Sequence, residues 1–196
     1  MTRRIVCASG VGGLVAAVAT PVMGQALSHA YGLHNRQTLR FVRGQANGPR
    51  PLVVMVGGTR PVPLRQARLL VSRGMSVALI DRRLERHGFQ AHISDIARAM
   101  AYLVARKDRL ELGEGLALWG EGAGAQAVAL TLKDRRYLSA TGLHPRSVWG
   151  AVLLSQMPVR DATFTVAEAY GSGEPAALLH TKKATEGAAF LSGLLG

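Results

Sequence analysis

The sequence predicts an α/β protein in which a doubly wound, mostly parallel sheet lies between two helical layers, as a three-layer α/β/α sandwich. Three observations predict it. Short apolar runs, typical of strands buried on both faces, alternate with stretches of helical periodicity. The runs end in glycine-rich or polar turns. The chain has 196 residues, of which 48% are hydrophobic, which indicates one domain with a sizeable core.

The expected elements follow a polar, basic N-terminal segment, residues 27–50, in which Arg36–Val42 alternates loosely as an edge strand would. The domain proper is expected over residues 51–196. Because such sheets bind ligands beyond the carboxyl ends of their strands, a site is expected in the segments that follow the strands. The expected strands are Leu52–Val56, Met75–Ile80, Leu116–Trp119, Val148–Leu154 and Ala176–His180, and the expected helices are Leu64–Ser72, His92–Arg106, Ala125–Leu132 and Glu186–Leu195.

Residues 1–26 have the pattern of a secretory signal peptide. Two arginines near the initiator Met precede a mostly apolar run over residues 5–22, and small residues follow it. Gly24-Gln25-Ala26 fits a cleavage site, and Ser28-His29-Ala30 is a second option. We expect export to the periplasm or the extracellular space, by the Sec or the twin-arginine route. The alternative is that this segment is not cleaved and remains as an N-terminal membrane anchor. Once the segment is cleaved, no stable membrane span is expected.

The stretch over residues 116–130 carries the strongest functional signal. A predicted strand runs into the glycine-rich turn Gly120–Gly124 and then directly into a helix. This turn resembles the nucleophile elbow of the α/β-hydrolase superfamily, G-x-S-x-G. Its first and last glycines match the two glycines of the family pattern. Gly122 stands where the family has its nucleophilic serine.

The resemblance covers roughly residues 36–185 and implies a site of the carboxylic-ester or acyl hydrolase class. In that superfamily, backbone N–H groups form an oxyanion hole. Gly57 and Gly58, after the first core strand, match the segment that supplies one such group. Ala123, after the nucleophile position, matches the other. Glu121 and Ala123 occupy the variable elbow positions, and Glu121 is a candidate pocket-lining or displaced acidic residue.

The catalytic groups of the family are unmatched. Glycine at position 122 has no side chain that can attack a carbonyl carbon. The family acid follows the seventh strand, where this chain has Thr181–Ala184; Asp161 is an alternative acid. The family histidine follows an eighth strand, which is not evident, and His180 is the histidine placed at the carboxyl end of a predicted strand.

We therefore expect an α/β-hydrolase-like protein with impaired catalysis. Three interpretations stay open: an impaired ester hydrolase, a pseudoenzyme that binds a small ester or acyl ligand, and a truncated or frame-shifted derivative of a full hydrolase. A fourth comes from Gly120–Ala125, which also fits the dinucleotide fingerprint G-x-G-x-x-A. Against it, two predicted strands precede this turn, and the next strand ends at Ser155-Gln156 without the expected acidic residue. No cofactor and no metal site is predicted.

The charge balance is strongly basic, with a formal net charge of +12 that falls only to +10 without the predicted signal. The basic residues are dispersed and not interleaved with aromatic residues, so a basic surface without specific nucleic-acid binding is expected. The single cysteine, Cys7, excludes an intramolecular disulfide and a Cys-rich zinc module. His29 and His34 are expected to be solvated. The oligomeric state is left open.

Overall fold

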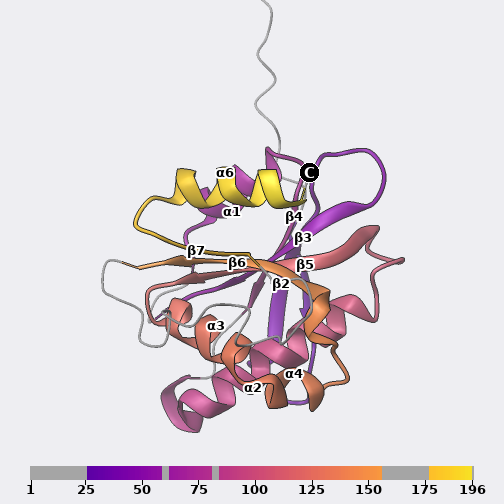
Figure 1. Ribbon diagram of the computed structural model, residues 1–196. Helices are drawn as coiled ribbons and strands as arrows, with labels where there is room; N and C mark the ends of the chain where they lie inside the picture. The colour runs from indigo at the N-terminus through magenta and orange to yellow at the C-terminus, as the bar shows by residue number, and fades with distance from the viewer. Residues whose placement is uncertain (1–25, 59–61, 81–83, 156–176, 196) are drawn as a thin grey trace, which may run out of the picture.

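The computed structural model describes residues 26–58, 62–80, 84–155 and 177–195. A seven-stranded sheet with the order β1-β2-β4-β3-β5-β6-β7 lies between two layers of helices (Figure 1). This arrangement confirms the predicted three-layer α/β/α sandwich. The predicted signal peptide, apart from Ala26, lies outside the described residues.

The sheet is parallel over its five central and C-terminal strands, and β1 and β2 extend it antiparallel at one edge. Parallel strands covered on both faces need apolar residues in succession, which explains why their sequences read as continuous apolar runs. The strands are β1 (Leu27–Ala30), β2 (Thr38–Val42), β3 (Arg50–Val56), β4 (Ser76–Ile80), β5 (Leu112–Glu121), β6 (Val148–Leu154) and β7 (Ala177–Thr181).

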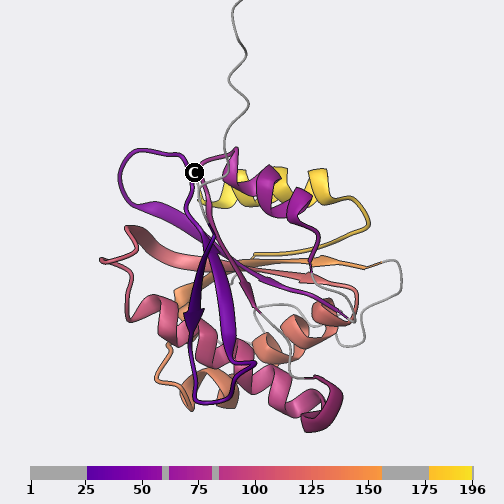
Figure 2. The same cartoon turned by 180° about the vertical axis from the view of Figure 1, so that it is seen from behind.

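Helices α1 and α6 cover one face of the sheet, and α2, α3 and α4 cover the other (Figures 1 and 2). Alternate side chains of each strand enter the two resulting cores. On β3, for example, Val53 and Met55 pack on the α1–α6 side, and Val54 packs on the α2–α3 side. The helices are α1 (Leu64–Val71), α2 (Leu84–Val104), α3 (Ala123–Lys133), α4 (Arg135–Ser139) and α6 (Ala184–Leu195), with a 3-10 turn over Pro145–Ser147.

Several predicted boundaries were wrong. Helix α2 begins at Leu84 rather than His92, and Gly88, with φ +73°, interrupts its helical backbone. Strand β5 begins at Leu112, four residues before its predicted start. The sequence did not predict this beginning, because Gly113 and Gly115 interrupt the apolar run there. Strand β2 begins at Thr38 rather than Arg36, and it is not an edge strand, because β1 pairs with its outer side. The short helix α4 and the 3-10 turn were not predicted.

Strand β1 was not predicted either, because most of its side chains are exposed and give no alternation. It forms a hairpin with β2 that lies beside α2 (Figure 2). Buried Gln37, between the two strands, donates from Nε2 to Oδ1 of buried Asp95 on α2, at 2.8 Å. His29 and His34 are partly buried, not solvated. Nδ1 of His29 lies 3.1 Å from the Tyr102 hydroxyl of α2, and Nδ1 of His34 accepts from the backbone N–H of Arg36 at 3.1 Å.

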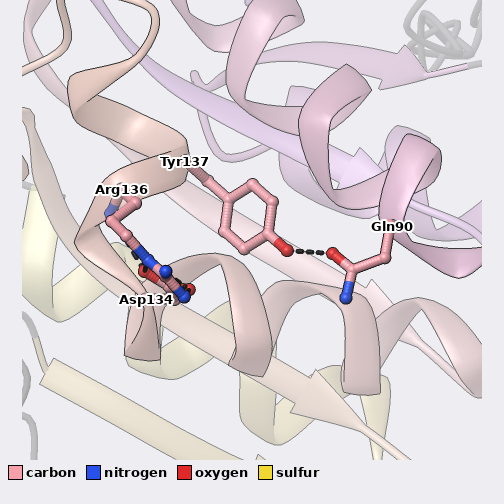
Figure 3. Close-up of polar contacts among 4 residues, drawn as sticks. All are labelled: Gln90, Asp134, Arg136 and Tyr137. Atoms are coloured by element: carbon pink, nitrogen blue, oxygen red, sulfur yellow. Dashed lines mark hydrogen bonds and ion pairs between the residues drawn. The ribbon is translucent and has the colours of Figure 1, made fainter.

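A second polar connection joins α4 to the start of α2 (Figure 3). Tyr137 donates its hydroxyl hydrogen to Oε1 of Gln90. Asp134 caps α4 by accepting from the backbone N–H of Arg136 at 3.1 Å, and the Arg136 guanidinium donates to both of its oxygens. These hydrogen bonds lower the pKa of Asp134, so the capping carboxylate is ionised at neutral pH.

In the described part of the chain, no helix is both long and apolar enough to cross a membrane.

Candidate functional site

The carboxyl ends of β3 and β5 meet at the centre of the sheet, where Val56 pairs with Gly120. The predicted elbow lies directly beyond this pair. Helix α3 begins at Ala123, immediately after the single turn residue Gly122. The backbone N–H of Gly122 donates to the carbonyl oxygen of Leu154 on β6, at 2.9 Å. The strand–turn–helix context that the sequence predicted is therefore present.

Two elbow glycines are required by packing. A Cβ on Gly124 would lie 2.2 Å from the carbonyl oxygen of Val56, at the end of β3. A Cβ on Gly120 would lie 2.5 Å from Cα of Ala125, in the first turn of α3. Both neighbours are backbone atoms, which cannot move aside as the end of a flexible side chain can. The first turn of α3 thus packs against β3 and β5 at a distance that only glycine allows.

Gly58 is held equally closely against the turn. A Cβ on Gly58 would lie 2.8 Å from the backbone nitrogen of Ala123 and 2.9 Å from the carbonyl oxygen of Glu121. The structure therefore brings together two of the three predicted oxyanion-hole positions, Gly58 and Ala123. The third, Gly57, is buried like Gly58, and its carbonyl oxygen would lie 2.7 Å from a Cβ on Gly124, so it takes part in the same close packing.

Ala123 is the first residue of α3, and its N–H is one of the initial helix donors that have no partner within the helix. The first turn of α3 holds no acidic residue, and Gly122 and Ala123 are exposed. A helix N-terminus carries a partial positive charge and favours an electronegative oxygen. The turn can therefore hold a carbonyl oxygen or an oxyanion.

Gly122 differs from the other elbow glycines because nothing crowds it. Its φ of 57° and ψ of −120° place it in a backbone conformation that side chains rarely adopt. A Cβ on it would meet no atom of the described residues within 4 Å. A serine would have room here, at a conformational cost of about 1–3 kcal/mol. The turn thus has room for a side chain at the position that the sequence analysis matched to the family nucleophile.

Glu121, the last residue of β5, carries an unfavourably placed carboxylate. Its Oε2 is buried and accepts no hydrogen bond from the residues that the structure describes. Strand alternation places Glu121 on the same side of the sheet as Trp119, below α1 and α6. Burying a carboxylate oxygen without a donor costs free energy, so this residue does not stabilise the fold.

The predicted acid and histidine are placed as follows. Asp161 lies outside the described residues. His180 is in β7, in register with Leu153 of β6, which is itself in register with Gly120. These three residues form one row across the sheet, so two strand spacings, about 10 Å, separate the backbones of His180 and Gly120.

A carboxylate near the end of β7 escaped the sequence analysis. Glu186, in the first turn of α6, accepts from the Thr181 hydroxyl at 2.6 Å and pairs with Nζ of Lys183 at 3.0 Å. The Thr181 hydrogen bond and then Lys183 lower its pKa. Since both oxygens are engaged, Glu186 holds the start of α6 to β7 rather than replacing the family acid. An acidic residue in a helix's first turn was the signal that could have found it.

Within the described ranges, no three His, Cys, Asp or Glu side chains are grouped so that they could hold a metal ion.

Solved esterase structures share this fold at low sequence identity. Esterase B from Lactobacillus rhamnosis is 18% identical, with a TM-score of 0.54 over 65% of this chain and 46% of its own. A hyperthermophilic esterase from the archaeon Pyrobaculum calidifontis is 21% identical, with a TM-score of 0.52 over 81% of this chain and 52% of its own. A candidate thioesterase from Silicibacter sp. TM1040 is 18% identical, with a TM-score of 0.54 over 87% of this chain and 72% of its own.

These similarities show that the chain has the α/β-hydrolase fold, as the elbow resemblance predicted. The chain spans about half the length of the two esterases. No protein-family model and no curated protein matches the sequence.

The packing of the elbow predicts that two Gly-to-Ala substitutions change the free energy of unfolding in opposite directions. Gly124→Ala should lower the free energy of unfolding by about 3 kcal/mol, because the new methyl group would overlap backbone atoms of β3. Gly193→Ala should raise the free energy of unfolding by about 0.5–1 kcal/mol, because Gly193 lies in helix α6 and a Cβ on it would meet no atom of the described residues within 4 Å. Urea unfolding measures both; equal effects would contradict the close approach of α3 to β3.

The buried Oε2 of half-exposed Glu121 predicts that removing its carboxylate stabilises the protein. Glu121→Met keeps the length of the side chain and should raise the free energy of unfolding by about 1–2 kcal/mol, since a buried oxygen without a donor is eliminated. Glu114→Met is the control, because Glu114 is exposed and its ion pair with Lys107 should contribute no more than about 1 kcal/mol. A loss of stability in Glu121→Met would show that the carboxylate is satisfied.

Proposed function

We propose that this chain is an exported α/β-hydrolase-like protein that binds a small ester or acyl compound at the elbow without hydrolysing it through a serine nucleophile. The observation that carries the proposal is Gly122, which has an elbow conformation and open space but no attacking group. The esterase fold of the neighbours supports the ligand class.

The expected binding mode follows from the donors at the turn. The carbonyl oxygen of the ligand accepts from the N–H of Ala123, beside the backbone of Gly58, which packs against this turn. This arrangement favours a polarised or anionic oxygen. An oxyanion hole and binding alone supply about 10³–10⁴-fold acceleration over water, far less than a complete triad. Tight binding with little turnover is therefore expected.

Export is proposed on the N-terminal sequence, in which two arginines, an apolar run and small residues follow one another. The periplasm or the extracellular space is the expected location, and retention as an N-terminally anchored protein is the alternative.

A phosphonate probe tests the catalytic part of the proposal. Esterase B is described as inhibited by a tributyrin phosphonate. Incubation of this protein with a reactive fluorophosphonate should leave its intact mass unchanged, because position 122 has no hydroxyl to phosphonylate. An adduct on any serine of the folded protein, lost on unfolding, would contradict the proposal.

The same probe tests the geometry of the turn in Gly122→Ser. The introduced hydroxyl should be labelled, because the Ala123 N–H stabilises the charge that develops on the phosphonyl oxygen. Labelling should be slow, because no general base is matched in this chain. Gly142→Ser is the matched control: Gly142 also has positive φ (+74°) and open space around its Cβ, but lies far from the elbow in sequence, after α4. Equal labelling of the two variants would argue against a functional oxyanion hole.

Ligand-induced thermal stabilisation tests binding. A panel of short-chain esters and carboxylates at about 100 times Kd should raise Tm by about 5–10 °C. Ala123→Pro removes the proposed donor at the first helix position, where proline fits the helix itself, so the ligand-induced shift should be lost. Its Tm without ligand should fall, because the backbone of Gly58 packs against the Ala123 nitrogen that would carry the ring, so the shift is measured from the variant's own Tm. If no ester or acyl compound shifts the Tm of the unmodified protein, the binding proposal is wrong.

A further inference from the structure

We infer that the exported chain is processed at the Ala26–Leu27 peptide bond and that the mature protein begins with strand β1. This inference rests on the proposed export. The sequence offers two cleavage sites, after Ala26 and after Ala30, and small-x-small spacing alone does not choose between them. The structure separates them, because the four residues between the two bonds form β1.

The pairing of β1 begins at the first residue after the proposed bond. Leu27 is opposite Phe41, and the register continues without a break to Ala30 opposite Thr38. The backbone N–H of Tyr31 then donates to the carbonyl oxygen of Gln37, at 2.8 Å, and closes the hairpin. The Ala30–Tyr31 bond is thus inside the hydrogen-bonded hairpin, whereas Ala26 is exposed and precedes the first paired residue.

The side chains of β1 also contribute to the domain. The His29 ring packs edge-on against Phe41 of β2 and against Tyr102 of α2, with ring centroids 6.3 and 6.0 Å apart. Its Nδ1 lies 3.1 Å from the Tyr102 hydroxyl, and the Arg106 guanidinium lies over the Tyr102 ring at 3.8 Å. Phe41 is only 3% exposed beneath this cover.

Cleavage after Ala30 would remove the β1 pairing and every contact of His29. It would delete the β1 side of the hairpin, expose the ring of Phe41 and leave the hydrogen-bonding edge of β2 open. An open edge favours association with other strands. Cleavage after Ala26 removes none of the contacts, since it leaves β1 whole.

The processing step is hydrolysis by a peptidase that recognises small residues at the first and third positions before the bond, here Ala26 and Gly24. Water adds across the bond, so that Ala26 gains a carboxylate and Leu27 gains an α-ammonium group. Leu27 is 55% exposed, so the new charge is solvated and requires no partner within the fold.

The test uses the full chain with a C-terminal tag, produced in a Gram-negative host and recovered from separated periplasm, membrane and cytoplasm. Intact mass and N-terminal sequencing should identify Leu27 as the first residue of the periplasmic protein. Ala26→Arg should accumulate as uncleaved precursor. Ala30→Arg, the matched control at another exposed alanine, should still be cleaved before Leu27.

The outcomes separate the cleavage site from the export proposal. Periplasmic protein that begins at Tyr31, or a block by Ala30→Arg and not by Ala26→Arg, overturns the site and leaves export intact. Full-length protein that stays in the cytoplasm overturns export itself, and full-length protein in the membrane fraction supports the anchored alternative over cleavage.

A comparison of two purified chains tests the structural reason for the choice. A chain that begins at Leu27 should unfold at the Tm of the processed protein. A chain that begins at Tyr31 should have a Tm lower by about 5 °C or more, because the β1 pairing and the His29 contacts are lost. Equal Tm values for the two chains would show that β1 does not determine which bond must be cut.

Discussion

The start of α3 lies directly against the end of β3, and this contact between two backbones determines the geometry of the whole site. Gly124 meets the carbonyl oxygen of Val56, and Gly58 meets the backbone nitrogen of Ala123. The contact fixes the direction in which the chain leaves β5, so that the residue between strand and helix adopts a positive φ. It also places the N-terminus of α3, with its partial positive charge, at the carboxyl edge of the sheet.

Because packing creates the turn, the turn does not depend on the nucleophile. A Cβ on Gly122 would meet no atom of the described residues within 4 Å, so a side chain at this position leaves the surrounding glycines in place. Glycine also removes the conformational cost that a serine has at positive φ. An elbow of this kind can lose its attacking group while its donors and its open space persist, which is why the structure is compatible with binding that does not lead to hydrolysis.

The sequence predicted the parts of the fold that are buried on both faces, and it failed where burial is partial. The runs at Val53–Val56 and Val148–Leu154 are apolar throughout because helices cover both sides of these strands. Strand β1 is mostly exposed, so no pattern marked it. In the site, the spacing of glycines predicted the elbow. The burial of the Glu121 carboxylate and the pairing of Glu186 with Thr181 depend on tertiary contacts, which spacing does not encode.

Stability alone does not account for the residues at the carboxyl ends of β3 and β5. A fold optimised for stability would have no reason to keep a buried carboxylate oxygen without a donor at Glu121, next to a helix N-terminus that has no acidic residue in its first turn. Local costs of this kind concentrate at functional positions in other proteins. Packing explains Gly58, Gly120 and Gly124, and the positive φ of the turn explains glycine at position 122, whereas the buried Oε2 of Glu121 has no such explanation. The open space at Gly122 and the side chain of Glu121 beside it are therefore the part of the elbow in which a ligand-binding role is to be sought.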